Sequence, residues 1–312
     1  MTTYLLRRLW QMVPTLFGVV LLVFVLFKFV GGDPAQTLAS LNATPKEIAD
    51  IRAQLGLNEP WWIQLGIYLR GVATFDWGLS WATKEPVAHL FATRLPATLT
   101  VMLPILLLDT LVAIPIALGV AYVRGSLTDR VVMIVTTVAL SISFLVYIIV
   151  GQYFFAFRLG WFPVQGWSDS TWTNLSTFTP LPVLLAVAVG LSPQTRLYRT
   201  FFLDEMGHDY VRTARAKGLT EPAVMLRHVL RNALIPILTN VGLLVPGILA
   251  GSFLIEVFFS IPGLGREVIL AVNRNDYPVI QATTVYLAAL TMVVNLLTDV
   301  LYRLVDPRVV LK

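Results

Sequence analysis

Long apolar runs alternate with shorter polar segments along the whole chain. The runs lie at 9–30, 99–123, 131–157, 181–198, 234–255 and 279–304. A helix of about 20 apolar residues crosses the roughly 30 Å of hydrocarbon in a bilayer. The pattern therefore predicts an all-α polytopic membrane protein with six transmembrane helices. The first helix is expected to remain uncleaved, because no small-residue cleavage site follows it.

The fourth run carries the weakest spanning signal. Only about ten apolar residues precede Ser192-Pro193-Gln194, which is too few to cross the hydrocarbon unaided. We expect this span, alone among the six, to be broken and to be sheltered by neighbouring helices.

A polar segment, 31–96, separates the first two spans and contains one amphipathic helix. The sequence PKEIADIRAQLGL has Thr44 before it as a cap and Gly56 as a stop. The aromatic residues that follow are Trp61, Trp62, Tyr68, Trp77 and Trp81. Such aromatics are typical of the membrane–water interface, and a vestibule that touches an external partner is the alternative. A shorter loop, 258–278, has a turn at Pro262-Gly263 and a helix ending near Asn273.

The most charged stretch, 204–231, follows the fourth span and is typical of two short helices joined at a glycine. Asp204 and Glu205 suit the first turn of a helix, while Arg212, Arg215 and Lys217 lie near its last turn. Gly218 follows as a helix-ending glycine, because glycine enters the left-handed region at little cost.

A second helix is predicted from Thr220, with Glu221 and Pro222 in its first turn and an end before Pro236. The elbow between the two helices carries small residues that would let another surface approach closely: Ala214, Ala216 and Gly218. These residues favour a docking site. A charged loop that only follows the positive-inside rule is the alternative.

The run DYVRTARAKGL, followed by LRHVLRNALIPILT, resembles the cytoplasmic coupling loop of ABC-importer permeases, in particular the B-type subunit of dipeptide, oligopeptide and nickel importers. The resemblance covers nearly the whole chain, through YLLRRLWQMVPTLFGVVLLVFVLFKFVGGDPA, LGLNEPWWIQ, FSIPGLGREV and VDPR. The wider family has Glu-Ala-Ala, three residues and Gly, and here Arg212, Thr213 and Ala214 take the first three places before Gly218. The missing Glu, and Arg231 where a later Pro is expected, resemble the peptide-permease branch.

This resemblance implies the type I ABC importer permease fold and a subunit that forms half of a translocation pathway for peptides. It implies a division into a first span with a periplasmic segment (1–96), a core with the coupling loop at 200–233 (97–304) and a cytoplasmic tail (305–312). Nickel chelates, glutathione and opines are alternative cargoes. An ion-coupled secondary transporter is a further alternative, which would require paired broken helices.

The implied partners are a second, homologous C-type permease subunit, two ABC ATPase subunits, a periplasmic or extracellular substrate-binding protein and the membrane lipids. The chain itself would bind no cofactor, because ATP and Mg²⁺ belong to the ATPases. The implied location is the bacterial inner membrane.

Two sets of candidate residues follow. The ATPase-docking set on the coupling loop comprises Asp209, Tyr210, Arg212, Ala214, Arg215, Ala216, Lys217, Gly218 and Glu221. The second set comprises polar residues of the spans, which either line the pathway or bond neighbouring helices: Asp109, Gln152, Asn240, Glu256, Asn295 and Asp299. A charge at the bilayer centre costs about 3 kcal/mol, so both aspartates are expected to face protein or water.

Composition and motifs exclude further classes of protein. The chain is 56% hydrophobic and 13% charged, which is about half the charged fraction of soluble domains. It has no Cys, and His89, His208 and His228 are widely separated, so neither a catalytic site nor a metal site is predicted. There is also no phosphate-binding glycine loop, and no Ser-Lys or Asp-Asp catalytic set presents itself. The sequence therefore predicts a protein that is not an enzyme.

The basic residues indicate the topology. The net charge is +5, and 14 of the 23 Lys and Arg residues fall on the side of the predicted spans that holds the N-terminus. Both termini and the coupling loop are therefore predicted to be cytoplasmic. This explains the positive charge without a nucleic-acid partner.

Overall fold

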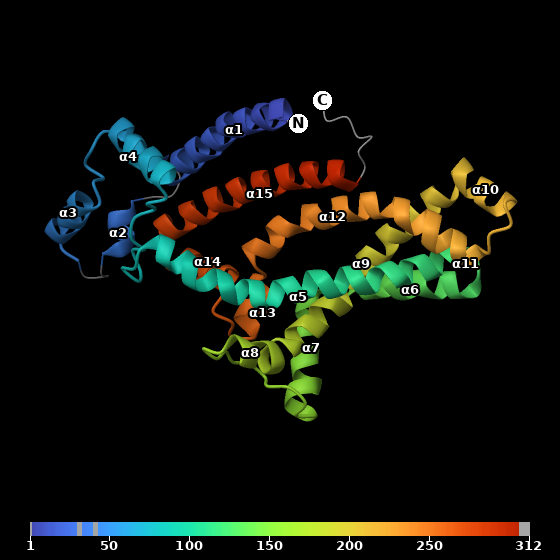
Figure 1. Cartoon of the computed structure of the whole chain (residues 1–312). Coiled ribbons are helices and arrows are strands. Elements are labelled where there is room, and N and C mark those ends of the chain that lie inside the picture. Colours follow the sequence, from blue (N-terminus) through green and yellow to red (C-terminus); the bar gives the residue numbers. More distant parts are fainter. Residues whose placement is uncertain (1, 30–32, 40–42, 306–312) are drawn as a thin grey trace. The chain divides into compact units, whose positions relative to one another are not determined.

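The computed structural model describes residues 2–29, 33–39 and 43–305 (Figure 1). This part of the chain is helical and has no β-strand, only an isolated bridge between Leu79 and Pro86, so the predicted all-α class is confirmed. The first elements are α1 (Thr2–Phe29), α2 (Pro34–Leu38), α3 (Pro45–Gln54), α4 (Trp61–Thr74), α5 (Val87–Tyr122), α6 (Leu127–Ser141), α7 (Phe144–Gly151) and the π-helical segment η1 (Gln152–Arg158). The remaining elements are α8 (Thr171–Thr173), η2 (Asn174–Phe178), α9 (Pro180–Met206), α10 (Asp209–Ala216), α11 (Glu221–Val224), η3 (Met225–Val229), α12 (Leu230–Ala250), α13 (Phe253–Phe258), α14 (Leu264–Asn273) and α15 (Tyr277–Val305).

The described part of the chain has four candidate membrane spans, and six, the predicted number, when each of two bent helix pairs is counted as one span. Four are unbroken helical stretches: Leu6–Phe29, Val87–Tyr122, Glu221–Ile248 and Tyr277–Thr298. The other two are bent helix pairs, each taken as one span, with angles of 88° between α6 and α7–η1 and 57° between α8–η2 and α9. The hydrophobic pattern thus located the spans, although not their bends.

The prediction that the fourth span alone is broken is wrong. Helix α9 runs uninterrupted through Pro193, since a proline at membrane depth is tolerated where neighbouring groups satisfy the freed backbone. The 57° bend lies before this helix. The sharper bend lies in the third run, which was expected as one helix over 131–157. Ile142 and Ser143 are both extended there, with ψ of 128° and 139°, and cannot continue α6.

The predicted end of a helix before Pro236 is also wrong. The helical stretch that begins at Glu221 continues through Pro236 and Pro246 to Ala250. Gly251, at φ +80°, then ends it. As a result Glu256, which directly follows the fifth apolar run, belongs to the separate helix α13.

The segment after α1 forms the predicted amphipathic helix α3. Thr44 and Glu47 form a capping box, because the Thr44 hydroxyl accepts from the Glu47 N–H at 3.3 Å and the Glu47 carboxylate accepts from the Thr44 N–H at 2.7 Å. Gly56 ends the helix at φ +65°. Both predicted signals are therefore confirmed, as is the end of α14 at Asn273.

Packing divides the chain into two units. The first contains Met1–Ala97 and Pro262–Leu296, and the second contains Thr98–Ile261 and the part of α15 from Leu297. The first unit has a core in which Val87 and Leu90 pack with Ala271, Val279 and Ala282. The second unit has a larger core, described below with the candidate site.

Asp276 fixes the loop before α5 within the first unit. Its carboxylate is 2% exposed and accepts from the Ser80 hydroxyl, from the Trp81 N–H at 3.0 Å and from the Ala82 N–H at 3.2 Å. Each hydrogen bond to a charged group stabilises a fold by about 1.5–3 kcal/mol. This one side chain therefore holds the loop against the start of α15.

Replacing Asp276 by alanine is expected to lower the free energy of unfolding by about 3 kcal/mol, because a buried hydroxyl and two partly buried N–H groups lose their acceptor. The measurement is the thermal midpoint of the purified chain in detergent, with the rate of proteolysis within the 78–86 loop as a local readout. Asp169→Ala is the matched control, since Asp169 is exposed. Equal effects of the two variants would show that the Asp276 carboxylate does not hold the loop.

Candidate functional site

Helix α10 and Gly218 form the elbow that the sequence predicts. Gly218 has φ +81°, its N–H donates to the Arg215 carbonyl at 2.9 Å, and the Leu219 N–H donates to the Ala214 carbonyl at 3.4 Å. This pair of bonds is the Schellman motif, which satisfies the last carbonyl groups of a helix and requires a left-handed residue after it. A side chain at Gly218 would meet open space, so the glycine is required by its backbone conformation.

The start of this helix differs from the prediction. Asp204 and Glu205 lie in the last turn of α9, and α10 begins at Asp209 after a break at Gly207 and His208. The favourable acidic charge in the first turn therefore comes from Asp209. The sequence pattern missed the break because acidic residues suit the first turn of a helix equally well at Asp204 and Glu205 or at Asp209.

The second arm of the elbow is the beginning of a membrane span. Thr220 occupies the predicted cap position, although its side chain makes no capping bond, and Glu221 and Pro222 form the first turn. From there the helical stretch runs through η3 into α12 without a break. Movement of the elbow would therefore act directly on the fifth span.

An ion pair closes the elbow on its exposed side. Arg215 donates from Nε to Oε1 of Glu221 at 2.7 Å and from a terminal nitrogen to Oε2 at 3.1 Å. Both side chains are more than a third exposed, so we expect the pair to stabilise the fold by less than about 1 kcal/mol. Arg212 and Asp209 form a second, more exposed pair at 3.4 Å on α10 itself.

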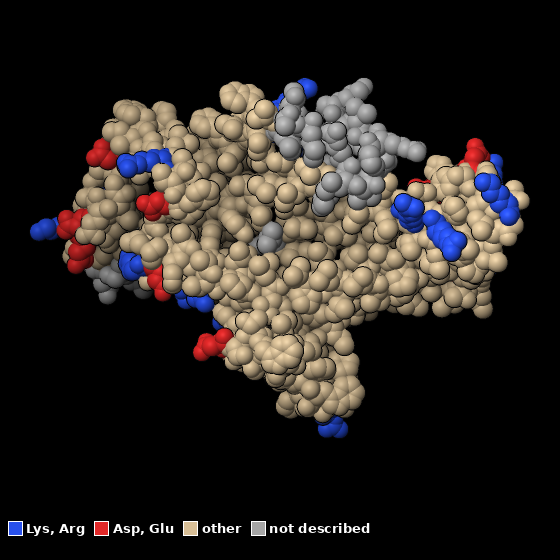
Figure 2. Space-filling view, viewed as in Figure 1, with Lys and Arg blue, Asp and Glu red and all other residues tan. Residues whose placement is uncertain are grey.

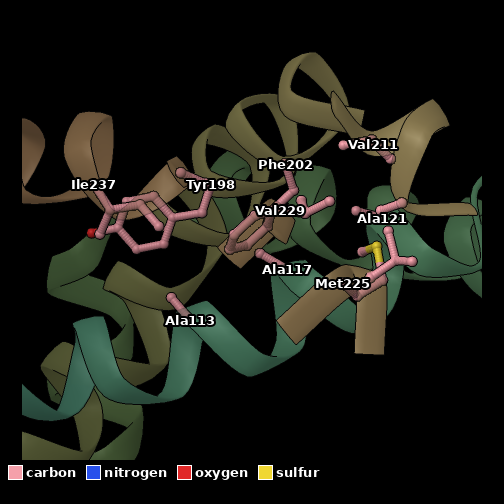
Figure 3. Close-up of a cluster of buried hydrophobic side chains, with 12 residues drawn as sticks. Ala113, Ala117, Ala121, Tyr198, Phe202, Val211, Met225, Val229 and Ile237 are labelled. Atoms are coloured by element: carbon pink, nitrogen blue, oxygen red, sulfur yellow. The ribbon is translucent and has the colours of Figure 1, made fainter. Parts of the chain in front are cut away.

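The underside of α10 is built into the core of the second unit (Figure 3). Val211 and Ala214 are buried there with Val224, Met225, Val229, Ala233 and Ile237 of the following helical stretch, Tyr198 and Phe202 of α9, and Ala113, Ala117 and Ala121 of α5. Three spans thus share one core with the elbow. Since close-packed cores transmit displacement, a force on α10 would reach all three.

This packing corrects the predicted docking set at one position. Ala214 is only 4% exposed and faces the core, so it cannot contribute to an outer contact surface. Its small size instead allows α10 to approach the spans closely. The other predicted residues remain accessible: Asp209, Arg212, Arg215, Ala216, Lys217 and Gly218 are exposed, and Tyr210 and Glu221 are half-buried. Figure 2 shows the charged side chains gathered over α10 and α11.

Tyr210 anchors the start of α10. Its hydroxyl donates to the Glu205 carboxylate at the end of α9, and Asn232 is a further hydrogen-bond partner. Burial, and then the neighbouring Glu205 carboxylate, raise the pKa of Tyr210 to about 12. The phenol is therefore protonated, and able to donate, throughout the physiological pH range.

Three of the predicted polar residues of the spans bond separate partners within the second unit. Glu256 is fully buried and accepts from the Thr98 hydroxyl at 2.9 Å. Gln152 donates to the carbonyl groups of Val164 and Phe258, both at 3.0 Å. Asn240 accepts from the Tyr198 hydroxyl at 3.4 Å. These contacts are bonds between elements of the second unit.

Three predicted polar residues remain. Asp109 is buried in α5 beside Gly190 of α9, and its Oδ1 has no hydrogen-bond partner in the part of the chain that the structure describes. Asn295 lines a small cavity of about 180 Å³ between α1 and α15. The side chain of Asp299 lies outside the described residues, as does the 306–312 tail.

A buried ion pair near the site was not predicted. Arg199 of α9 donates to both carboxylate oxygens of Asp129, at 2.9 and 2.8 Å, and the Gly125 N–H donates to the same carboxylate at 2.9 Å. The pair ties the start of α6 to α9. The only sequence signal was Arg199 at the end of the fourth apolar run, and the positive-inside rule accounts for an arginine there without an ion pair.

Among the described residues there is no group of three or more acidic or histidine side chains that could hold a metal ion. The accessible features are instead the elbow and a large cavity in the first unit. The described chain is thus a helical protein with candidate membrane spans, and its exposed, charged elbow packs onto three of them.

Comparison with known proteins identifies the family. Residues 113–311 match the binding-protein-dependent transport system inner membrane component, and residues 1–102 match the N-terminal component of the same systems. The chain belongs to this family. It is therefore a permease subunit of an ABC transport system and an integral inner-membrane protein, and such a system includes an ATPase component and a binding protein.

Relatives align over 99% of this chain and 99% of their own length. The dipeptide transport system permease protein of Alkalihalophilus pseudofirmus is 33% identical. A putative peptide transport system permease protein of Brucella abortus and the glutathione transport system permease protein of Salmonella choleraesuis are each 36% identical. Family membership excludes the ion-coupled secondary transporter considered above.

Proposed function

We propose that this chain forms half of the pathway of an ABC importer for short peptides, delivered by a substrate-binding protein. The observation that carries the proposal is the elbow at Gly218, which presents an exposed charged surface on one side and packs against three spans on the other. The names of the relatives support peptides as the cargo class.

The elbow is the proposed docking site for an ATPase subunit. Arg212, Arg215 and Lys217 offer charge-assisted hydrogen bonds to a groove on the ATPase, and the exposed backbone at Gly218 permits close approach. When the ATPase subunits bind ATP and close around it, they would displace α10. The shared core would pass this displacement to α5, α9 and α12, which then move as packed units between an inward-open and an outward-open state.

The proposed assembly contains a second, homologous permease subunit, two ATPase subunits and the binding protein. Both termini and the elbow would lie in the cytoplasm, and the 31–96 segment would face the periplasm. ATP and Mg²⁺ would bind the ATPases alone, so this chain would hold no cofactor and catalyse no reaction.

Glutathione is the second candidate cargo. The observation that favours it is the 36% identity to glutathione permeases over the whole chain. Glutathione is itself a tripeptide, so the two candidate cargoes are chemically close. An uptake assay that compares labelled dipeptide, tripeptide and glutathione would separate them.

The test is purification of the tagged chain in mild detergent, followed by reconstitution of everything that co-purifies. We expect a second permease subunit and two ATPase copies, and ATP-dependent uptake of a labelled peptide once the binding protein is added. A chain that purifies alone and moves solute without ATP would contradict the proposal.

A further inference from the structure

The first unit contains a cavity of about 1340 Å³ that the coupling mechanism does not use. The ends of α1 and α15 line it together with α4, the end of α3 and the loop before α5. Cavities that bind small organic ligands usually measure about 300–1,000 Å³. This one is therefore large enough for a peptide of several residues.

Aromatic rings form its walls in a fixed arrangement. Phe24 stacks on Tyr68 with ring centres 6.0 Å apart, and Tyr277 lies between Phe27 and Trp81 at 5.2 and 5.5 Å. The Asp276 carboxylate described above holds the backbone of Trp81 in place. The walls are thus pre-organised, which reduces the entropy that a ligand must lose on binding.

Charged groups of both signs line the same cavity. Arg70 and Asp76 are exposed, and the guanidinium of Arg70 has no partner among the described residues. The Tyr68 hydroxyl is buried and also lacks a partner there. Lys28 and Arg52 are already engaged, with Gln64 at 2.9 Å and with the Asp33 carboxylate respectively. The Asp76 carboxylate accepts one hydrogen bond, from the exposed Gly78 N–H at 3.3 Å, and its other oxygen is open to a ligand. The Arg70 guanidinium, the Asp76 carboxylate and the Tyr68 phenol can therefore all bond a ligand.

We propose that this cavity is a receiving site on the outer side of the membrane, which the peptide occupies before it passes between the spans. The inference rests on the proposed function. A peptide with free ends carries a carboxylate that suits Arg70, an ammonium group that suits Asp76 and amide groups that suit Tyr68. The side chains of the peptide can pack against the aromatic walls of the cavity. The presence of both charge signs favours this zwitterion over an anionic lipid, for which Asp76 would be unfavourable.

Cysteine protection tests the site directly, because the chain contains no Cys. Thr74 lines the cavity, and its exposed neighbour Ala73 does not, so Thr74→Cys and Ala73→Cys are matched reporters. Each would be placed in the complete transporter in phosphatidylcholine vesicles and treated with an impermeant maleimide. The probes are Ala-Phe-Ala with free ends and the same peptide with both ends blocked.

We expect Ala-Phe-Ala to slow labelling of T74C by about tenfold at saturation, and the blocked peptide to slow it by less than about twofold, since charge-assisted bonds provide most of the recognition. Labelling of A73C should not change. Equal protection by both peptides, no protection, or protection by added phosphatidylglycerol or by ligand-free binding protein would overturn the proposal.

Uptake separates this inference from the function on which it rests. Arg70→Gln and Asp76→Asn should each raise the peptide concentration for half-maximal uptake by about tenfold, while the maximal rate is retained. Lys46→Gln is the charge-matched control, since Lys46 is exposed on α3 and does not line the cavity. Normal peptide uptake with an unprotected T74C would overturn the receiving site alone. Failure of the wild-type transporter to take up any peptide would overturn both.

Discussion

Gly218→Asp is expected to abolish ATP-driven uptake while the chain still inserts into the membrane. The residue at this position must adopt φ +81°, which costs an L-residue roughly 1–2 kcal/mol. That cost is too small to unfold a protein of this size. A carboxylate at the exposed tip of the elbow, however, would prevent close approach of the ATPase and oppose any acidic group there. Uptake should therefore fall by much more than stability.

The chain supplies a matched control for this experiment. Gly56 ends α3 with the same pair of Schellman bonds, from Gly56 to the Ala53 carbonyl at 3.1 Å and from Leu57 to the Arg52 carbonyl at 3.0 Å. A side chain at Gly56 would likewise meet open space. Gly56→Asp thus carries the same backbone cost and the same charge at a site remote in the sequence from the elbow, and the ATPases should still co-purify with it.

Gly218→Asn separates charge from conformation, because asparagine enters the left-handed region more readily than most residues. We expect it to retain more uptake than Gly218→Asp. The measurements are peptide uptake in vesicles and co-purification of the ATPases with each variant. Full uptake by Gly218→Asp, or an equal loss of ATPase co-purification in Gly56→Asp, would contradict docking at the elbow.

Local rules were sufficient for much of the fold and for the shape of the elbow. The hydrophobic pattern located the six spans, and the capping box at Thr44 and the left-handed positions of Gly56 and Gly218 were read from neighbouring residues. These features depend on bonds between residues a few positions apart. Their energies are therefore determined almost entirely by the local sequence.

Proline was the misleading signal. Pro193, Pro236 and Pro246 all lie inside helices, whereas the helices end at Ile142 and at Gly251. Within packed spans the freed backbone groups find other partners, so proline does not determine where a helix ends. Ile142 has no comparable local signal. After it, α7 packs against α9 and α13 and does not continue α6, an arrangement that the sequence pattern does not encode.

Contacts between distant residues were equally hidden. Asp276 accepts from backbone groups nearly 200 positions earlier, and Asp129 pairs with Arg199 at a separation of 70. Likewise, the burial of Ala214 is determined by α5 and α9 rather than by its own helix. One-dimensional patterns select residue types for such contacts, but they do not assign the partners.

Removing one partner of the Asp129–Arg199 pair should cause a large loss of stability. The two side chains are only 8% and 19% exposed, so Asp129→Ala leaves an arginine charge largely buried without its counter-ion. Breaking a buried pair in this way typically costs about 3–5 kcal/mol. Because Asp129 also lies in the first turn of α6, the substitution removes a favourable interaction with the helix dipole. We expect a loss of about 3 kcal/mol, measured as a lower thermal midpoint in detergent.

The exposed pair Asp209–Arg212 is the matched control, with side chains that are 95% and 75% exposed. Asp209→Ala should change stability by less than about 0.5 kcal/mol, because water screens the lost interaction. The double variant Asp129→Leu with Arg199→Met tests the cause, since replacing both ions by apolar side chains avoids the unpaired charge and should recover most of the loss. If Asp129→Ala and Asp209→Ala were equally mild, the ion pair would not hold α6 to α9. If the double variant were as unstable as Asp129→Ala, the loss would come from the bonds to Asp129 itself, at Arg199 and at the Gly125 N–H, rather than from the uncompensated charge.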